Sequence, residues 1–521
     1  MGLTSLYARK DRELPGRIKK TIQNSLTPSK ASAPSSSDYS SSDRLLLRAI
    51  AWTTSAKWIS QIVNWAITLI VARLLAPSDY GLVGMATLAL GLVTLLTEFG
   101  LGATVVTLRN TSEEHISQLN TISILMGLVG FLISIGITFP ISRFFRAPAL
   151  RPIIVVMGIS FLISSLRTIP FSLLEKDMRF KDMAVIDGLQ SIIQATVTLL
   201  LAALGFRYWA LVLGNLTTSV VSTSLTLIWK RHPFAWPSYS QLRAPLLFSW
   251  HIIVGRVSWF TYDNADFMIA GRVLGEDPLG AYTLAWTLAH TPLEKLTVLV
   301  NRVTPSFFAS IQKDLAALRR YLLSITRSLA LVVFPITVGL SLVAKDFIPL
   351  VLGAKWHNAI APLQLLAFHA LLRSNVIVVM PMINAIGQAR FAMWQNVASA
   401  LILPVSFYVA SHWGTVGIAS VWVIVFPFLQ VPIYFRLFRR IQMSALKYLE
   451  AVWPAVNGCI VMAAAVESSK LVQDSRHSTY FRLASQIFTG ALVYVLVLLI
   501  AHRQTISGLM RLIKNFRDES I

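Results

Sequence analysis

Stretches of about twenty mostly apolar residues recur along almost the whole chain, and they limit what it can fold into. A helix needs about 20 such residues to cross a hydrocarbon core about 30 Å thick. Of the 521 residues, 55% are hydrophobic and only 13% are charged, whereas soluble domains carry about 25% charged residues. This balance excludes a soluble globular enzyme, and the abundance of apolar residues excludes a disordered or fibrous chain. The sequence therefore predicts an all-α polytopic membrane protein.

Breaks at charges, proline and glycine divide the apolar sequence into about fourteen predicted transmembrane helices. Their limits are 50–72, 81–106, 119–141, 152–173, 184–204, 208–229, 246–271, 280–301, 323–344, 361–386, 392–411, 415–435, 448–468 and 480–501. The loops between these helices are at most about 25 residues long. They leave no room for a catalytic domain outside the membrane.

The charge is strongly positive, with 46 Lys and Arg against 24 Asp and Glu and a net charge of +22. In a soluble protein this excess would suggest a nucleic-acid partner. Here the cations lie between the apolar runs, and most fall on alternate loops, which marks those loops as cytoplasmic. An even number of helices then places both termini in the cytoplasm. No nucleic acid is expected as a partner.

The two ends of the chain lie outside the predicted helices. Residues 1–48 are basic and then serine-rich, which is typical of a disordered cytoplasmic tail, and the start has no signal peptide. Residues 14–26 form either a basic amphipathic helix on anionic lipid or a solvated linker. The predicted domains are the tail 1–48, a six-helix bundle 49–230, a second six-helix bundle 231–440, two further helices within 441–502, and a basic cytoplasmic tail 503–521.

An internal repeat relates the two predicted bundles. An offset of 199 residues aligns Ala72–Ala86 with Gly271–Ala285, and both stretches run from the exit of a first helix into a second. Arg73, Leu75, Gly81 and Ala86 then meet identical residues, Arg272, Leu274, Gly280 and Ala285. Because 199 residues contain six predicted helices, the two halves insert in the same orientation. We therefore expect a parallel repeat with a pseudo-two-fold axis along the membrane normal.

Several short motifs resemble those of a known family. They are ARLLAPSDYGLVGMA at 72–86 after a Trp-rich first helix, FGLG at 99–102, LLEKDMRFK at 173–181, and, in the second copy of the repeat, GRVLG at 271–275 with LGAY at 279–282. Together they resemble the polysaccharide transport (Wzx-type oligosaccharide flippase) family of the MOP exporter superfamily, over roughly residues 45–440. This resemblance implies movement of undecaprenyl-diphosphate-linked oligosaccharide repeat units across the bacterial inner membrane, by alternating access of two six-helix bundles.

Polar side chains at membrane depth are the candidate functional residues, because a charge there costs roughly 2.5–3.5 kcal/mol and needs a partner, a wet cavity or a role. In the first predicted helix, Lys57, Gln61 and Asn64 share one face. Arg256 on the seventh helix corresponds to Lys57 in the repeat. We expect this pair of cations to line a shared cavity and bind the diphosphate.

The seventh predicted helix also carries Asp263 and Asp266, within one helical sector of Arg256. One interpretation gives these carboxylates a role in ion coupling, because burial favours a bound proton. The alternative is structural, with Asp263, Asp266 or Glu98 forming a buried ion pair with Arg256 or Lys57 that holds helices together.

Three more residues complete the set of candidates. Arg167 and Arg373 are further substrate-binding cations, although Arg167 is close enough to a helix end to extend to the interface instead. Glu98 is a third candidate for ion coupling, and its alternative role is to anchor a helix end. The sequence predicts no cofactor and no metal, since His251, His290 and His369 lack ligand spacing and the single cysteine is Cys459.

Two other functions compete with an oligosaccharide flippase. One is a cation-coupled drug exporter of the same superfamily, in which the cavity is usually acidic. The other is a polytopic enzyme, either a polysaccharide polymerase or an acyltransferase, with His290 as the one candidate for acyl transfer. The expected partners are a lipid-diphosphate-linked oligosaccharide, membrane lipids and, in the biosynthetic machinery, a polysaccharide polymerase and a chain-length regulator.

Overall fold

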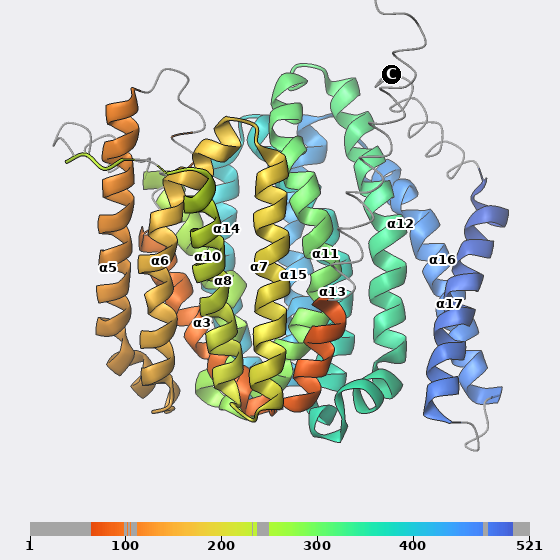
Figure 1. The fold of residues 1–521 in the computed structure, drawn as a ribbon. Coiled ribbons are helices and arrows are strands. Elements are labelled where there is room, and N and C mark those ends of the chain that lie inside the picture. Colours follow the sequence, from red (N-terminus) through yellow and green to blue (C-terminus); the bar gives the residue numbers. More distant parts are fainter. Residues whose placement is uncertain are drawn as a thin grey trace, which may run out of the picture. The chain divides into compact units, whose positions relative to one another are not determined.

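The computed structural model describes residues 64–97, 102, 105, 112–231, 233–236, 250–472 and 478–503, all of which belong to one compact unit, 60–518. The long helices in this part of the chain run side by side (Figure 1). They are α3 (Pro77–Thr97), α5 (Glu113–Phe145), α6 (Leu150–Lys176), α7 (Phe180–Ala203), α8 (Tyr208–Trp229), α10 (Trp250–Val273), α11 (Glu276–Ser310), α12 (Leu315–Phe347), α13 (Ile360–Ala385), α14 (Ala389–Ala410), α15 (Gly414–Arg440), α16 (Ala445–Val472) and α17 (Thr479–Ala501).

Four shorter helical segments complete the described structure. A short apolar helix, Asn64–Leu74, precedes α3. Two segments, Ile348–Leu352 (η1) and Ala354–Ala359 (η2), join α12 to α13, and Ser411–Trp413 (η3) joins α14 to α15. The described part of the chain contains no strand, so the predicted all-α polytopic fold is confirmed.

Local signals in the sequence set the ends of several helices. At the start of α12, Asp314 accepts hydrogen bonds from the backbone N–H groups of Ala316 and Ala317, which satisfies two donors that the first turn leaves free. Ser478 caps α17 in the same way. Gly387 and Gly414 lie at helix boundaries with positive φ values of 75° and 69°, a conformation that glycine adopts without strain.

Ten helical stretches in the described part of the chain are long and apolar enough to cross a membrane. One of them, Ala389–Arg440, contains both α14 and α15. The helices α10 and α11 are outside this set, as is the eleven-residue helix Asn64–Leu74. Every predicted span has a helical counterpart, but the total of fourteen membrane crossings stays a prediction.

Two hydrophobic clusters form most of the interior. The larger one gathers buried side chains of α3, α10, α11, α13 and α15, and its largest members are Tyr282, Trp356, Trp422 and Phe407. The second joins α12, α13 and α15 to α16 and α17. In Figure 1, α16 and α17 lie on the outer side of α12, and their contacts with the rest of the protein are mainly with that helix. The last two helices are therefore an addition to the central group.

The helices α3 and α11 approach each other through glycine. An added Cβ on Gly81 would overlap the backbone carbonyl of Glu276, and one on Gly280 would overlap the carbonyl of Pro77. Gly81 and Gly280 are partners at the offset of 199 residues, and so are Pro77 and Glu276. The two contacts are therefore exchanged by the internal repeat. Small residues allow membrane helices to pack this closely.

Further contacts link the two halves at the end where α10 ends and α11 begins, called here the α10–α11 end. The buried indole of Trp356 donates a hydrogen bond to the carbonyl of Ala72 at 2.8 Å. Lys355 Nζ donates to the carbonyl of Arg73 at 2.6 Å, and Arg73 donates to the carbonyl of Val351 at 3.3 Å. The end of the helix Asn64–Leu74 is thus held by η1 and η2 of the second half.

Candidate functional site

An ion pair lies near the middle of α10 and α13. Arg373 Nη1 and Nη2 donate to Asp263 Oδ1 and Oδ2 at 2.7 and 3.2 Å, so the contact is bidentate. The Arg373 side chain is 27% exposed and the Asp263 side chain 15%, so the pair is partly accessible. Arg373 also lies over the Trp286 ring, 6.0 Å from its centroid. A planar guanidinium in this position suits an anionic group such as a phosphate.

Asp266, one turn along α10, belongs to a buried hydrogen-bond network. Its Oδ2 accepts from Tyr282 Oη at 2.6 Å and from Trp422 Nε1 at 2.8 Å, and its Oδ1 accepts from the backbone N–H of Phe267. The Trp422 indole is also within 3.2 Å of Tyr282 Oη. This network ties α10 to α11 and α15. Three donors around one carboxyl group satisfy its hydrogen-bonding capacity inside the protein.

We expect Trp422→Phe to destabilise the protein, because the change leaves Asp266 without one of its donors. Leaving a buried polar group without one of its partners costs about 1–3 kcal/mol, and thermal denaturation of the purified protein in detergent measures the loss. Trp413→Phe is the matched control, since Trp413 in η3 is 70% exposed and should leave the midpoint unchanged. An equal shift in both variants would show that the bond to Asp266 contributes nothing specific.

Two histidines on different helices lie against each other beside the ion pair. His290 Nε2 on α11 is 3.1 Å from His369 Nδ1 on α13, and His290 Nδ1 is 3.1 Å from the carbonyl of Trp286. The Trp286 ring stacks on His290 at 3.9 Å between centroids, and Trp422 stacks on His369 at 4.5 Å. Both histidines are buried. Within the described residues, no three His, Cys, Asp or Glu side chains are placed to hold a metal ion.

The predicted site residues fall into three groups. The structure brings Asp263 and Arg373 together, and it places Asp266 three residues from that pair in the sequence of α10. It does not pair Arg256 with either carboxylate: the Arg256 side chain is exposed, and Asp263 has Arg373 as its partner. The alternative of a buried ion pair between Arg256 and Asp263 is therefore wrong.

Asn64 and Arg167 lie on helices of the first half. Asn64 is half-buried in the short helix before α3. Arg167 on α6 lies over the Phe171 ring at 4.0 Å, and its Nε is buried without a described hydrogen-bond partner. Lys57, Gln61 and Glu98 lie outside the described residues.

Sequence reasoning named His290 and His369 but did not predict that they meet, and it missed the aromatic side chains around the ion pair. Tyr282, Trp286, His290, His369 and Trp422 come from three different helices, and their distances along the chain carry no sign that they meet. The one available signal was the number of polar residues on two otherwise apolar helices, α11 and α13. Tests of ligand spacing along a single helix do not detect a pair formed between helices.

The fold and the site define a multi-pass α-helical membrane protein with an accessible ion pair and a buried polar network among its central helices. The chain belongs to the polysaccharide biosynthesis protein family, whose model matches residues 70–361. It is 26% identical over 334 residues to the lipopolysaccharide biosynthesis protein WzxC of Escherichia coli (strain K12), covering 62% of this chain and 67% of WzxC. The family resemblance inferred from the sequence motifs is confirmed.

Two solved structures share the fold. The lipid II flippase MurJ, in an inward closed conformation, superposes with a TM-score of 0.63 at 13% identity, over 88% of this chain and 100% of MurJ. An inward-facing multidrug resistance MATE family transporter of the MOP superfamily superposes with a TM-score of 0.57 at 16% identity, over 75% of this chain and 98% of that one. The chain therefore shares its fold with these two transporters.

Proposed function

We propose that this protein is a flippase that moves a lipid-diphosphate-linked oligosaccharide across the membrane by alternating access of two six-helix bundles, 49–230 and 231–440. The observation that carries the proposal is the family match over residues 70–361 in a fold shared with a lipid II flippase. A lipid flippase and a drug exporter share that fold, so the fold alone leaves both open. The family and the WzxC relative favour a polysaccharide precursor.

The site geometry also favours an anionic substrate over the alternatives. The Arg373 side chain is 27% exposed beside Asp263, and an Arg–phosphate contact at about 5 Å and an effective dielectric constant near 20 contributes about 3 kcal/mol. A drug exporter with an acidic cavity would not need this cation. The acyltransferase alternative loses its candidate nucleophile or base, because the His290 ring is stacked on Trp286 and bonded to His369.

Within this proposal, the polar residues have two roles. Arg373, Arg256, Arg167 and Lys57 bind the diphosphate at successive stages of transport, with Gln61 and Asn64 on the same face as Lys57. In the proposed coupling step, a proton or another cation binds at Asp263, Asp266 or Glu98, and the membrane potential contributes about 2.3 kcal/mol per charge per 100 mV. Binding of a proton or another cation at Asp263 would weaken its ion pair with Arg373. The Arg373 guanidinium would then be free to bind the substrate.

We place the protein in the bacterial inner membrane with both termini in the cytoplasm. The oligosaccharide would then be delivered to a polysaccharide polymerase and a chain-length regulator on the outer face. In this orientation the α10–α11 end is external, and the opposite end, where α11 ends and α12 begins (the α11–α12 end), is cytoplasmic. The distribution of Lys and Arg between alternate loops supports it.

Reporter fusions test this orientation. A reporter that is active outside the cytoplasm should be active when fused after Gly275 and inactive when fused after Gln312, because α11 separates the two positions. A cytoplasmic reporter should give the opposite pattern. If both fusions report the same side, α11 does not cross the membrane and the arrangement of two six-helix bundles fails.

The function is tested by deleting the gene and identifying what accumulates. The expected result is accumulation of a lipid-diphosphate-linked oligosaccharide on the cytoplasmic leaflet, with loss of the surface polysaccharide. Re-expression of the gene should clear the accumulated oligosaccharide and restore the surface polysaccharide. Accumulation of single lipid-linked repeat units on the outer leaflet would instead indicate a polymerase. An unchanged surface polysaccharide with raised drug sensitivity would indicate a drug exporter.

A further inference from the structure

The α11–α12 end of the second half carries a group of cations that have no carboxylate partners among the described residues. They lie in residues 311–321, 386–391 and 436–443, and they are Lys313, Arg319, Arg320, Arg390, Arg436, Arg439 and Arg440. None of them forms an ion pair with a carboxylate in the described part of the chain. The one carboxylate in these segments is Asp314, which accepts hydrogen bonds from the first turn of α12.

The first half differs at the same end of the helices. Between α6 and α7, Arg179 pairs with Asp182 at 2.6 Å, and at the end of α8, Lys230 pairs with Asp177 at 2.8 Å. A preference for cations on one side of a membrane therefore does not require them to be unpaired. In the second half, by contrast, none of the seven cations has a carboxylate partner among the described residues.

Two of the seven cations are held by neutral groups of the protein. Arg319 donates to the carbonyl of Gln442 at 3.1 Å, which links the start of α12 to the turn after α15. Arg436 donates to Gln388 Oε1 at 2.8 Å, which links α15 to the turn after α13. These bonds join the three segments into one structure, so the space between them has defined walls.

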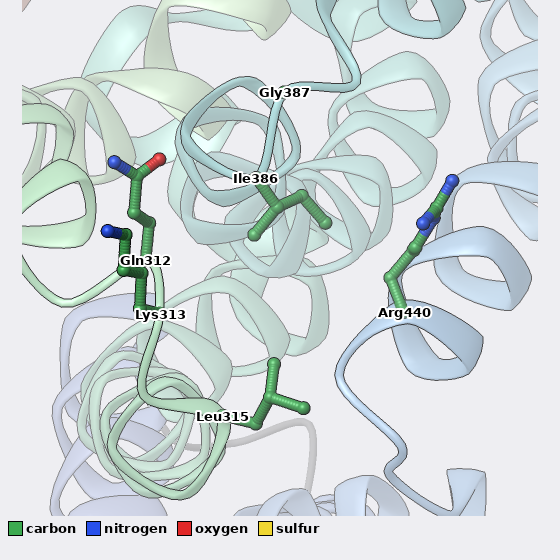
Figure 2. A pocket seen from close by; sticks show the side chains of 6 residues that line it. All are labelled: Gln312, Lys313, Leu315, Ile386, Gly387 and Arg440. Carbon is green, nitrogen blue, oxygen red and sulfur yellow. The ribbon is translucent and has the colours of Figure 1, made fainter.

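A pocket of about 410 Å³ lies between these segments, lined by Gln312, Lys313, Leu315, Ile386, Gly387 and Arg440. Figure 2 shows Gln312 and Lys313 on one side of the pocket and Arg440 on the other, with Ile386 between them and Leu315 below. Both cations are exposed, whereas Leu315 and Ile386 are half-buried. The pocket thus has a cationic rim and an apolar floor.

We propose that this pocket binds the headgroup of an anionic phospholipid, such as phosphatidylglycerol. Its position at the ends of four membrane helices, α11, α12, α13 and α15, places it at the level of the headgroups. Lys313 and Arg440 would hold the phosphate from two sides, and Leu315 and Ile386 would contact the glycerol and the first acyl carbons. Basic pockets between transmembrane helices are suited to anionic headgroups. This proposal does not rest on the proposed transport function.

Lipid titration of the purified full-length protein tests the site. In an uncharged detergent, native mass spectrometry should show that phosphatidylglycerol binds more tightly than phosphatidylcholine. Lys313→Ala and Arg440→Ala should each weaken phosphatidylglycerol binding about fivefold, and the double variant about 25-fold. Lys313→Arg should stay within about twofold of the native protein, because it keeps the charge. Phosphatidylcholine binding should not change.

The matched control removes the same charge from paired positions at the same end. Arg179→Ala with Lys230→Ala is expected to weaken phosphatidylglycerol binding by less than about twofold, because both cations already have carboxylate partners. Equal losses in the two double variants would overturn the proposal in favour of diffuse attraction. Displacement of the lipid by millimolar inorganic phosphate would also overturn it, since a free anion would then be the ligand. Loss of transport in either variant does not affect these readouts.

Discussion

Arg373→Ala is expected to lower export of the oligosaccharide by about 100-fold per molecule of protein. The removed cation accounts for about 3 kcal/mol of attraction to the diphosphate, and each 1.4 kcal/mol corresponds to a factor of ten. The change also leaves Asp263, 15% exposed, without its partner, so the amount of protein in the membrane should fall. Surface polysaccharide, divided by membrane abundance, measures the effect on transport alone.

A double variant separates the two consequences. Asp263→Asn with Arg373→Ala should restore the abundance, because no unpaired charge remains, but it should not restore export. Arg482→Ala is the matched control, since Arg482 and Asp346 form a similarly exposed ion pair between α17 and α12 at 3.2 Å. This control should lower abundance and leave export per molecule unchanged. If the double variant recovers both quantities, Arg373 is a structural partner and does not bind substrate.

The helical fold was readable from the sequence, because the hydrophobic effect acts on local runs of residues. Each predicted span has a helix over or near it, as 184–204 has in α7 (Phe180–Ala203). The start of α3 at Pro77 lies four residues before its prediction at 81. Proline at the first position of a helix needs no hydrogen-bond acceptor, so the polar residues that follow it were taken for a loop.

The site was less predictable, because side-chain partners depend on which helices meet. Arg256 and Asp263 are seven residues apart on one helix and share a face, which suggested a local pair. The partner of Asp263 is instead Arg373, 110 residues further along the chain. The hydrogen bonds that Asp266 accepts from Tyr282 and Trp422 also come from other helices. Periodicity identifies a polar face, but it contains no information on what that face contacts.

The glycine contact between α3 and α11 is the part of the packing that the repeat did indicate. Gly81 and Gly280 aligned in the sequence before their positions were known, and both lie where the helices touch. Gly84 and Thr283 are a further pair at the same offset, and an added Cβ on Gly84 would lie 3.2 Å from Thr283 Oγ1. An internal alignment thus marks residues near a symmetry axis, since equivalent positions can meet only there.

Gly81→Ala and Gly280→Ala are each expected to impair export by separating α3 from α11 at the α10–α11 end. The obstacle to the new methyl group is a backbone carbonyl, which cannot rotate away as a side chain can. Forced overpacking of this kind costs about 1–3 kcal/mol, and this would lower the population of the arrangement in which α3 and α11 touch by about 5- to 150-fold. Gly339→Ala in α12 is the control, because an added Cβ there has no atom within 4 Å.

The double glycine variant gives the sharper test, because the two contacts share one interface. Once the first methyl group has moved the helices apart, the second meets no carbonyl at close range. The double variant should therefore be about as impaired as the worse single variant, with a coupling free energy of about 0.5–3 kcal/mol. Labelling of Thr283→Cys, in a Cys459→Ser background, should rise in parallel as the contact opens. Fully additive losses of export, or unchanged labelling, would show that the two glycines do not belong to one shared contact between α3 and α11.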